Sequence, residues 1–204
     1  MKQILLVEGN DDQHVIWALC EKFNVPENFE VIETGGIDKL FEQLPVRLKE
    51  ADVKTIGIII DADTNIKSRW ATLNNILKEK MPSFPEEPNV KGTILKQDDL
   101  KVGIWLMPNN QTNGMLESFI EFLIPADDKL LPIVNAHLNK IEADSLNKYK
   151  PIHRDKAVIH AWLAIQEDPG TPMGLSLTKK YLTTDVEQCQ KLIDWLNALF
   201  NFLN

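Results

Sequence analysis

The sequence is poor in cysteine and lacks long apolar runs. It has two cysteines, Cys20 and Cys189, which lie far apart in helical patterns. Neither belongs to a CxxC pair, so we expect a reduced protein and a cytoplasmic location. The strongest apolar runs, such as 56–60, are strand-sized and fall well short of the roughly 18 residues of a membrane span. At the N-terminus one lysine precedes a short apolar run and then charge, which predicts a first strand and not a signal peptide.

Basic residues are outnumbered by acidic ones. The chain has 22 lysines and arginines against 30 aspartates and glutamates, for a formal net charge of −8. Because proteins gain nucleic-acid affinity largely by neutralising phosphates, binding here would need a local basic face or a metal ion. The segment 148–156 carries three lysines, one histidine and one arginine against Asp155. It is a candidate for such a face, and otherwise a solvated helix start.

The composition is that of an ordinary globular protein. Of 204 residues, 44% are hydrophobic and 25% are charged. This length supports one domain or one domain with an appendage, and it can bury a core without disulfides or a structural metal. The composition excludes collagen-like, coiled-coil and wholly disordered classes.

Strand-like and helix-like segments alternate in the first part of the chain. Four apolar runs predict strands at 2–7, 29–33, 55–60 and 102–107, and the proline-rich loop 82–88 leads to a short strand around 92–95. Helical spacing predicts a helix that begins after Asn10 or Asp11, and further helices at 37–51, 66–81 and 115–123. The helix at 37–51 is expected to be broken or kinked near Pro45. From Pro125 onward we predict helices at 126–142, 154–167 and 185–203.

This order predicts an α/β fold with a Rossmann-type parallel sheet covered by helices on both faces. We place the α/β core at residues 1–125 and a helical extension, packed on the core, at residues 126–204. In such sheets, ligands bind at the carboxyl ends of the strands. We expect the five tryptophans to be core residues and not base-stacking platforms, since most lie on helix faces.

Carboxylates follow the ends of the predicted strands. Glu8 ends the first strand with Asp12 four residues later, Asp61 and Asp63 end the third, and Glu117 follows the last strand near a helix start. Close carboxylates repel one another unless a cation neutralises them, and Mg²⁺ prefers oxygen ligands. Each residue alone also fits a helix cap or a helix-dipole partner. Their common position at one edge favours a site for Mg²⁺ or Mn²⁺.

Two of these motifs together resemble the toprim domain. Segment 5–12, LLVEGNDD, and segment 58–63, IIIDAD, are similar to its glutamate-glycine and Asp-x-Asp elements. The toprim domain occurs in primases, type IA and II topoisomerases, ribosomal-RNA maturases, recombination proteins and overcoming-lysogenization-defect nucleases. The Glu-Gly-x-x-Asp variant here resembles the maturase and nuclease branches, and segment 114–117 is similar to the later Gly-x-Leu-Glu element of that nuclease branch. The likeness covers about residues 1–125, and the helical remainder resembles small stand-alone toprim proteins of uncharacterised function.

The resemblance implies Mg²⁺-dependent phosphodiester chemistry on DNA or RNA, most simply that of a nuclease. By motif, Glu8 would transfer a proton or bind metal, and Asp61 and Asp63 would hold the ion. Asp12 and Glu117 would complete one or two metal sites. Both tyrosines lie in the helical part, so a topoisomerase-like covalent tyrosine is not supported.

One basic residue is a candidate for catalysis. Lys156 could steady a transition-state phosphate, and its alternative is an ordinary surface lysine. We therefore take Glu8 and Lys156 as the candidate catalytic residues.

Three other functions compete with this interpretation. In a haloacid-dehalogenase-like phosphatase, Asp61 would be the nucleophile, Asp63 the general acid and 98–99 the later metal-binding pair, but Glu8 would be unused. A phospho-receiver domain needs a lysine after a fifth strand, and no fifth strand is evident in the alternation of strands and helices. A non-catalytic module would bind Mg²⁺ or a nucleotide through the core and a protein partner through the helices. The acidic charge and the lack of the ATPase domain that accompanies the nucleases favour this last alternative.

Overall fold

The centre of the molecule is a five-stranded sheet of order β2-β1-β3-β5-β4. The computed structural model describes residues 2–201. The sheet's strands are β1 (Lys2–Val7), β2 (Glu30–Glu33), β3 (Val53–Asp61), β4 (Thr93–Gln97) and β5 (Leu100–Met107). All neighbours pair in parallel except β4 and β5, which are antiparallel. The predicted α/β class with a mostly parallel sheet is therefore confirmed.

The edge strand β4 departs from the predicted alternation of strand and helix. Gln97 pairs with Leu100, so β4 and β5 form a hairpin with two residues in its turn. Asp98, the first turn residue, has a φ of 52°, a left-handed conformation that aspartate tolerates better than most residues. The acidic pair 98–99 therefore forms the turn of this hairpin.

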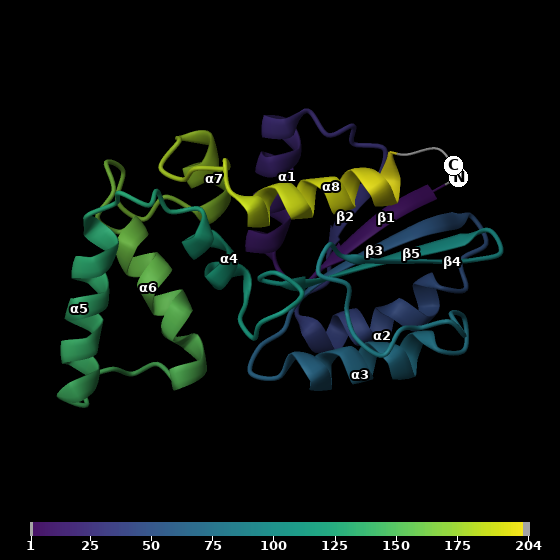
Figure 1. Ribbon diagram of the computed structural model, residues 1–204, viewed down its shortest axis with the longest axis horizontal. Coiled ribbons are helices and arrows are strands. Elements are labelled where there is room, and N and C mark those ends of the chain that lie inside the picture. The colour runs from purple at the N-terminus through teal and green to yellow at the C-terminus, as the bar shows by residue number, and fades with distance from the viewer. Residues whose placement is uncertain (1, 202–204) are drawn as a thin grey trace.

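Helices cover both faces of the sheet (Figure 1). The face with α2 (Ile37–Arg47) and α3 (Ile66–Leu77) is opposite to the face with α1 (Asn10–Phe23) and α8 (Glu187–Phe200). Alternate residues of β3 supply the two cores: Ile58 packs in the cluster with α2 and α3, and Ile59 in the cluster with α1 and α8. The continuous apolarity of this strand reflects burial on both sides.

The remaining helices follow β5 in the chain. They are α4 (Leu116–Phe122), α5 (Leu130–Ala143), the short 3₁₀ helix η1 (Pro151–His153), α6 (Arg154–Leu163) and α7 (Met173–Thr178). In Figure 1, α5 and α6 lie side by side beyond α4, at the end of the molecule away from the chain termini. Helix α7 was not predicted, because six residues are too few to display a helical period.

The last helix returns to the sheet. Gly57 of β3 and Gly103 of β5 face the side chain of Leu199, so α8 approaches the strands closely. The helix was predicted to run to residue 203, and residues 202–203 lie outside the described part of the chain. The boundary at residue 125 stays a prediction, although α8 shares the hydrophobic cluster of β1 and α1.

Two further expectations concern the whole chain. Both cysteines are buried and unpaired with one another. Among residues 2–201, no helix has both the length and the apolarity needed to cross a membrane.

Candidate functional site

The predicted carboxylates meet at the carboxyl edge of the parallel strands. Glu8 follows β1 and Asp61 ends β3, and these two strands are neighbours in register, with Val7 opposite Ile59. Asp12 lies in the first turn of α1, and Glu117 in the first turn of α4. The sheet order therefore brings together groups that are far apart in the sequence.

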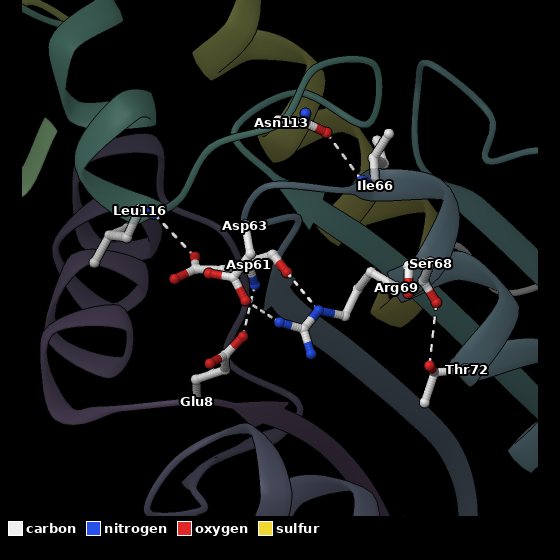
Figure 2. Close-up of polar contacts among 9 residues, drawn as sticks. All are labelled: Glu8, Asp61, Asp63, Ile66, Ser68, Arg69, Thr72, Asn113 and Leu116. Carbon is white, nitrogen blue, oxygen red and sulfur yellow. Dashed lines mark hydrogen bonds and ion pairs between the residues drawn. The ribbon is translucent and has the colours of Figure 1, made fainter. Parts of the chain in front are cut away.

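Asp61 links the end of β3 to both neighbouring segments (Figure 2). Its backbone N–H donates to Oε1 of Glu8 over 2.7 Å. Its carboxylate oxygen Oδ1 accepts from the N–H of Leu116 at the start of α4, over 2.9 Å. Burial raises the pKa of Asp61 well above its ordinary value, and the charges of nearby carboxylates, Glu8 first, raise it further.

Asp12, in the first turn of α1, is a buried carboxylate. Its side chain is 8% exposed, and its Oδ2 accepts from the N–H of Gly9 over 3.1 Å. Among the described residues, its Oδ1 is buried without a hydrogen-bond partner. Burial, followed by the charge of Glu8, raises the pKa of Asp12 to about 7. Burial also raises the pKa of Glu8, against the opposing effect of the Asp61 N–H.

Lys156, in the first turns of α6, lies at this cluster. Its Nζ is 3.0 Å from Oε1 of Glu117, whose side chain is 4% exposed. Burial lowers the pKa of Lys156, but the hydrogen bond from its Nζ and the charge of Glu117 outweigh that effect and raise it. A cavity of about 200 Å³ lies at this cluster. It is lined by Gly9, Asn10, Asp11, Asp12, Asp61, Leu116, Glu117 and Lys156.

Asp63 faces a residue that the sequence patterns did not single out. Arg69 of α3 pairs with Oδ2 of Asp63, and its Nε donates to the carbonyl oxygen of Asp61 over 3.0 Å (Figure 2). Arg69 therefore holds the Asp-x-Asp turn from the α3 side. Its position at the start of the helix after that motif is the signal that could have identified it.

The loop between β5 and α4 also supports this turn. Asp63 and Gly114 exchange two backbone hydrogen bonds of 2.8 Å. Asn113 accepts from the N–H of Ile66 at the start of α3 and donates to the carbonyl oxygen of Thr64. The side-chain amide of Asn113 thus ties the β5–α4 loop to the segment after Asp63, a role that the sequence did not reveal.

Of two other predicted sets of residues, the acidic pair 98–99 lies away from the site, and the basic segment 148–156 reaches it only in part. The pair 98–99 forms the β4–β5 turn, and Asp99 lies 3.7 Å from Lys54 near the beginning of β3, at the opposite edge from Asp61. In segment 148–156, Arg154 pairs with Glu142 of α5, whereas Lys156 reaches the cavity.

Comparison with known proteins places the chain in a family. A family model described as "protein of unknown function (DUF3226)" matches residues 2–201. The chain belongs to the DUF3226 family. A search of the curated proteins found no match.

The fold of this family member is similar to solved structures of one region of another protein. That region is the C-terminal region of the OLD protein of Xanthomonas campestris pv. campestris, in a structure phased with mercury. The TM-score is 0.51 at 14% identity, over 96% of this chain and 94% of that chain. A second structure of the region, phased with iodine, has a TM-score of 0.45 with the same identity and coverage. At this identity the likeness concerns the fold.

The carboxylates of this family member are not arranged as a finished metal site. Across residues 2–201, no group of three histidine, cysteine, aspartate or glutamate side chains is placed to hold an ion. Asp63 pairs with Arg69, and Glu117 pairs with Lys156. The unpartnered oxygen of Asp12 and the raised pKa values nevertheless fit a hard divalent cation, which would relieve the mutual repulsion. The role of each residue stays a prediction.

Proposed function

We propose that this protein catalyses Mg²⁺- or Mn²⁺-dependent cleavage of phosphodiester bonds in nucleic acid. The observation that carries the proposal is the convergence of Glu8, Asp12, Asp61 and Glu117, where burial and then the charge of Glu8 raise the pKa of Asp12 to about 7. Four interacting carboxylates at one edge destabilise the folded chain unless protons or cations bind there. Selection for function is the simplest reason to keep such a cluster, because perturbed groups gather at functional sites.

Each residue would have a distinct role. Asp12, Asp61 and Glu117 would hold the ion, with Asp63 available when Arg69 releases it. Glu8 would accept or deliver a proton, because burial moves its pKa upward toward neutral pH. A bound ion would neutralise charge on the phosphate and on the attacking oxygen.

Lys156 would couple substrate entry to the ligand set. Its side chain is 50% exposed, whereas its partner Glu117 is almost fully buried. A phosphate that enters the cavity would attract Nζ of Lys156 and leave the Glu117 carboxylate to a cation. The lysine would then hold a non-bridging phosphate oxygen, as we infer from its place at the cavity rim.

Similarity to known proteins supports the proposal at the level of fold. The sequence motifs at 5–12 and 58–63 resemble toprim domains of nucleases, and the fold resembles the C-terminal region of an OLD protein. A nucleic-acid substrate follows from that resemblance by analogy.

A non-catalytic metal-binding module that needs a protein partner is the second candidate. The ion pairs at Asp63 and Glu117 favour it, because each occupies a predicted ligand with the chain's own cation. The net charge of −8 also disfavours unaided binding of nucleic acid. A haloacid-dehalogenase-like phosphatase is not favoured, because 98–99 lies far from the Asp61 edge.

The test is calorimetric titration of Mg²⁺ and Mn²⁺, with a parallel cleavage assay on plasmid, single-stranded DNA and structured RNA. The wild type is compared with Asp61→Ala/Asp63→Ala and with a control, Asp98→Asn/Asp99→Asn, that makes the same charge change at the opposite edge of the sheet and keeps a residue that tolerates the left-handed turn. We expect the wild type and the control to bind metal and cleave, and the Asp61/Asp63 variant to do neither.

Other outcomes discriminate between the candidates. Metal binding without cleavage by the wild type would favour the partner-dependent module. Cleavage by the Asp61/Asp63 variant at the wild-type rate would refute the proposed site. No metal binding at millimolar concentration would leave the carboxylates as helix caps and dipole partners.

A further inference from the structure

Trp17 differs from the other tryptophans of the chain. Its side chain is 41% exposed, whereas Trp70 is 4% exposed and the remaining three are at most 1% exposed. The expectation that the tryptophans are core residues therefore fails at this one position. An aromatic ring of this size normally gains stability from burial, so its exposure on a well-packed helix needs another explanation.

The ring of Trp17 is ordered by its neighbour on the helix. It stacks on His14, with ring centroids 5.3 Å apart and an angle of 26° between the planes. The backbone at His14 is in turn held by α7, because Gly174 lies so close that a Cβ there would be 2.7 Å from the His14 carbonyl oxygen. The backbone that carries His14 is thus packed against α7, and the two aromatic rings stack on each other at the surface.

This aromatic pair extends from the candidate site. Asn10 lines the cavity, and His14 and Trp17 follow it at i+4 and i+7, on one face of α1. The buried face of the same helix is formed by Val15, Ile16 and Leu19. Seven residues at 1.5 Å each place Trp17 about 10 Å along the helix from Asn10. That length corresponds to about three base steps of a stacked strand.

We infer that His14 and Trp17 form a stacking platform for unpaired bases beside the cavity, which makes single-stranded nucleic acid the preferred substrate. This inference rests on the proposed function. Every base has a flat face that can stack on an aromatic ring, so such a platform tolerates any sequence. The bases of a duplex are already stacked on one another and do not offer that face without being unpaired.

The charge of the protein makes aromatic stacking more important here. With a net charge of −8, the chain gains little from general attraction to phosphates. Stacking does not depend on net charge, and it would supply affinity close to Lys156, where a phosphate would be held. Single-stranded binding by this protein should therefore depend less on salt than binding by a basic protein.

The test is fluorescence anisotropy with a labelled 12-nucleotide single strand and the matching duplex, in EDTA and again in Mg²⁺. Trp17→Ala should weaken single-strand binding about ten-fold or more, Trp17→Phe should retain most of it, and duplex binding should change less than two-fold. His14→Ala should give an intermediate loss. Ile133→Ala on α5 is the control, because it removes an exposed apolar side chain (65% exposed) from another surface.

The outcomes separate this inference from the proposed function. If Trp17→Ala binds single strands like the wild type while Asp61→Ala/Asp63→Ala loses cleavage, the platform is refuted and the function stands. Equal losses for single strand and duplex would also refute it. If the wild type binds no nucleic acid, both proposals fail. The thermal midpoint of each variant shows whether it is folded. If the midpoint of Trp17→Ala is lower than that of the wild type, Trp17→Phe is compared with the wild type instead.

Discussion

Burial determines the charge state of the carboxylates at the residue scale. Asp12 caps α1 through the N–H of Gly9, as an ordinary first-turn aspartate would, and also lies against Glu8 and Glu117. The capping and ligand interpretations of Asp12 are therefore compatible. Burial first, and the charge of Glu8 second, raise the pKa of Asp12 and outweigh the hydrogen bond from Gly9, which by itself lowers that pKa.

The pKa of Asp12 predicts how stability depends on pH. The folded chain keeps a proton on Asp12 up to about pH 7, whereas the unfolded chain releases it near its ordinary value of 3.8. Because the folded state binds more protons, the free energy of unfolding should fall as pH rises between these values, by up to about 4 kcal/mol. Asp12→Asn should remove this loss, so its advantage over the wild type in EDTA should grow with pH. Urea unfolding at pH 4, 5.5 and 7 measures it.

Added Mg²⁺ provides the control for this effect. An ion at the cluster should raise the thermal midpoint of the wild type more at pH 8 than at pH 5, since protons compete with the ion. A difference between Asp12→Asn and wild type that is constant across pH would contradict the prediction.

At the scale of elements, α4 and α6 are joined beside the site. Ser118 of α4 donates to Asp155 of α6 over 2.5 Å, and Lys156, the next residue of α6, pairs with Glu117, the preceding residue of α4. Helix α6 therefore does more than extend the fold, since it supplies the cation that compensates the buried Glu117. The sequence pattern could place both helices but not their contact.

Removing that cation should destabilise the α4–α6 contact. Lys156→Ala leaves Glu117 buried without a partner, so we expect the free energy of unfolding in EDTA to fall by about 1–3 kcal/mol. Lys148→Ala, on an exposed part of the chain before α6, is the matched control and should change it by less than about 0.5 kcal/mol. Urea denaturation of both variants makes the comparison. Equal stability of both would show that the ion pair is incidental.

At the scale of the whole molecule, β1 and α8, which are far apart in the chain, share one of the two cores. Leu199 and Phe200 of α8 pack over β3 and β5 in the same cluster as Leu5 of β1. This arrangement depends on glycine at positions 57 and 103, where a Cβ would overlap these side chains. Helix α8 thus completes the cover of the sheet face that also carries α1.

A methyl group at one of these glycines should separate α8 from the sheet. In Gly103→Ala the new Cβ would overlap the buried Leu199, and we expect a loss of about 1–3 kcal/mol in unfolding free energy. The double variant Gly103→Ala/Leu199→Ala should lose less than the sum of the two single losses, because the space removed by one change is provided by the other. Chemical denaturation of the four proteins gives the coupling, and additive losses would contradict the proposed contact.

Local patterns in the sequence were sufficient for the order of most elements and for the carboxylate positions. Apolar runs predicted β1, β3 and β5, and the carboxylates after them followed from where parallel strands end. The sequence missed the β4–β5 hairpin and α7, because both depend on a few turn or helix residues with no period. It also placed helix ends several residues too far, as for α3, which ends at Leu77.

The sequence by itself determined the α/β class, the alternation of elements and the strand ends at which Glu8 and Asp61 lie, because periodicity and strand polarity are local properties. Tertiary structure alone decided which charges meet. Lys156 reaches Glu117 through a contact between α6 and α4 that no local pattern encodes, and the packing of α1 leaves Trp17 exposed. Arg69 reaches Asp63 across the loop before α3, where its position was the only local signal. Burial and distance set pKa values and ion pairs, and both arise only when separate segments pack together.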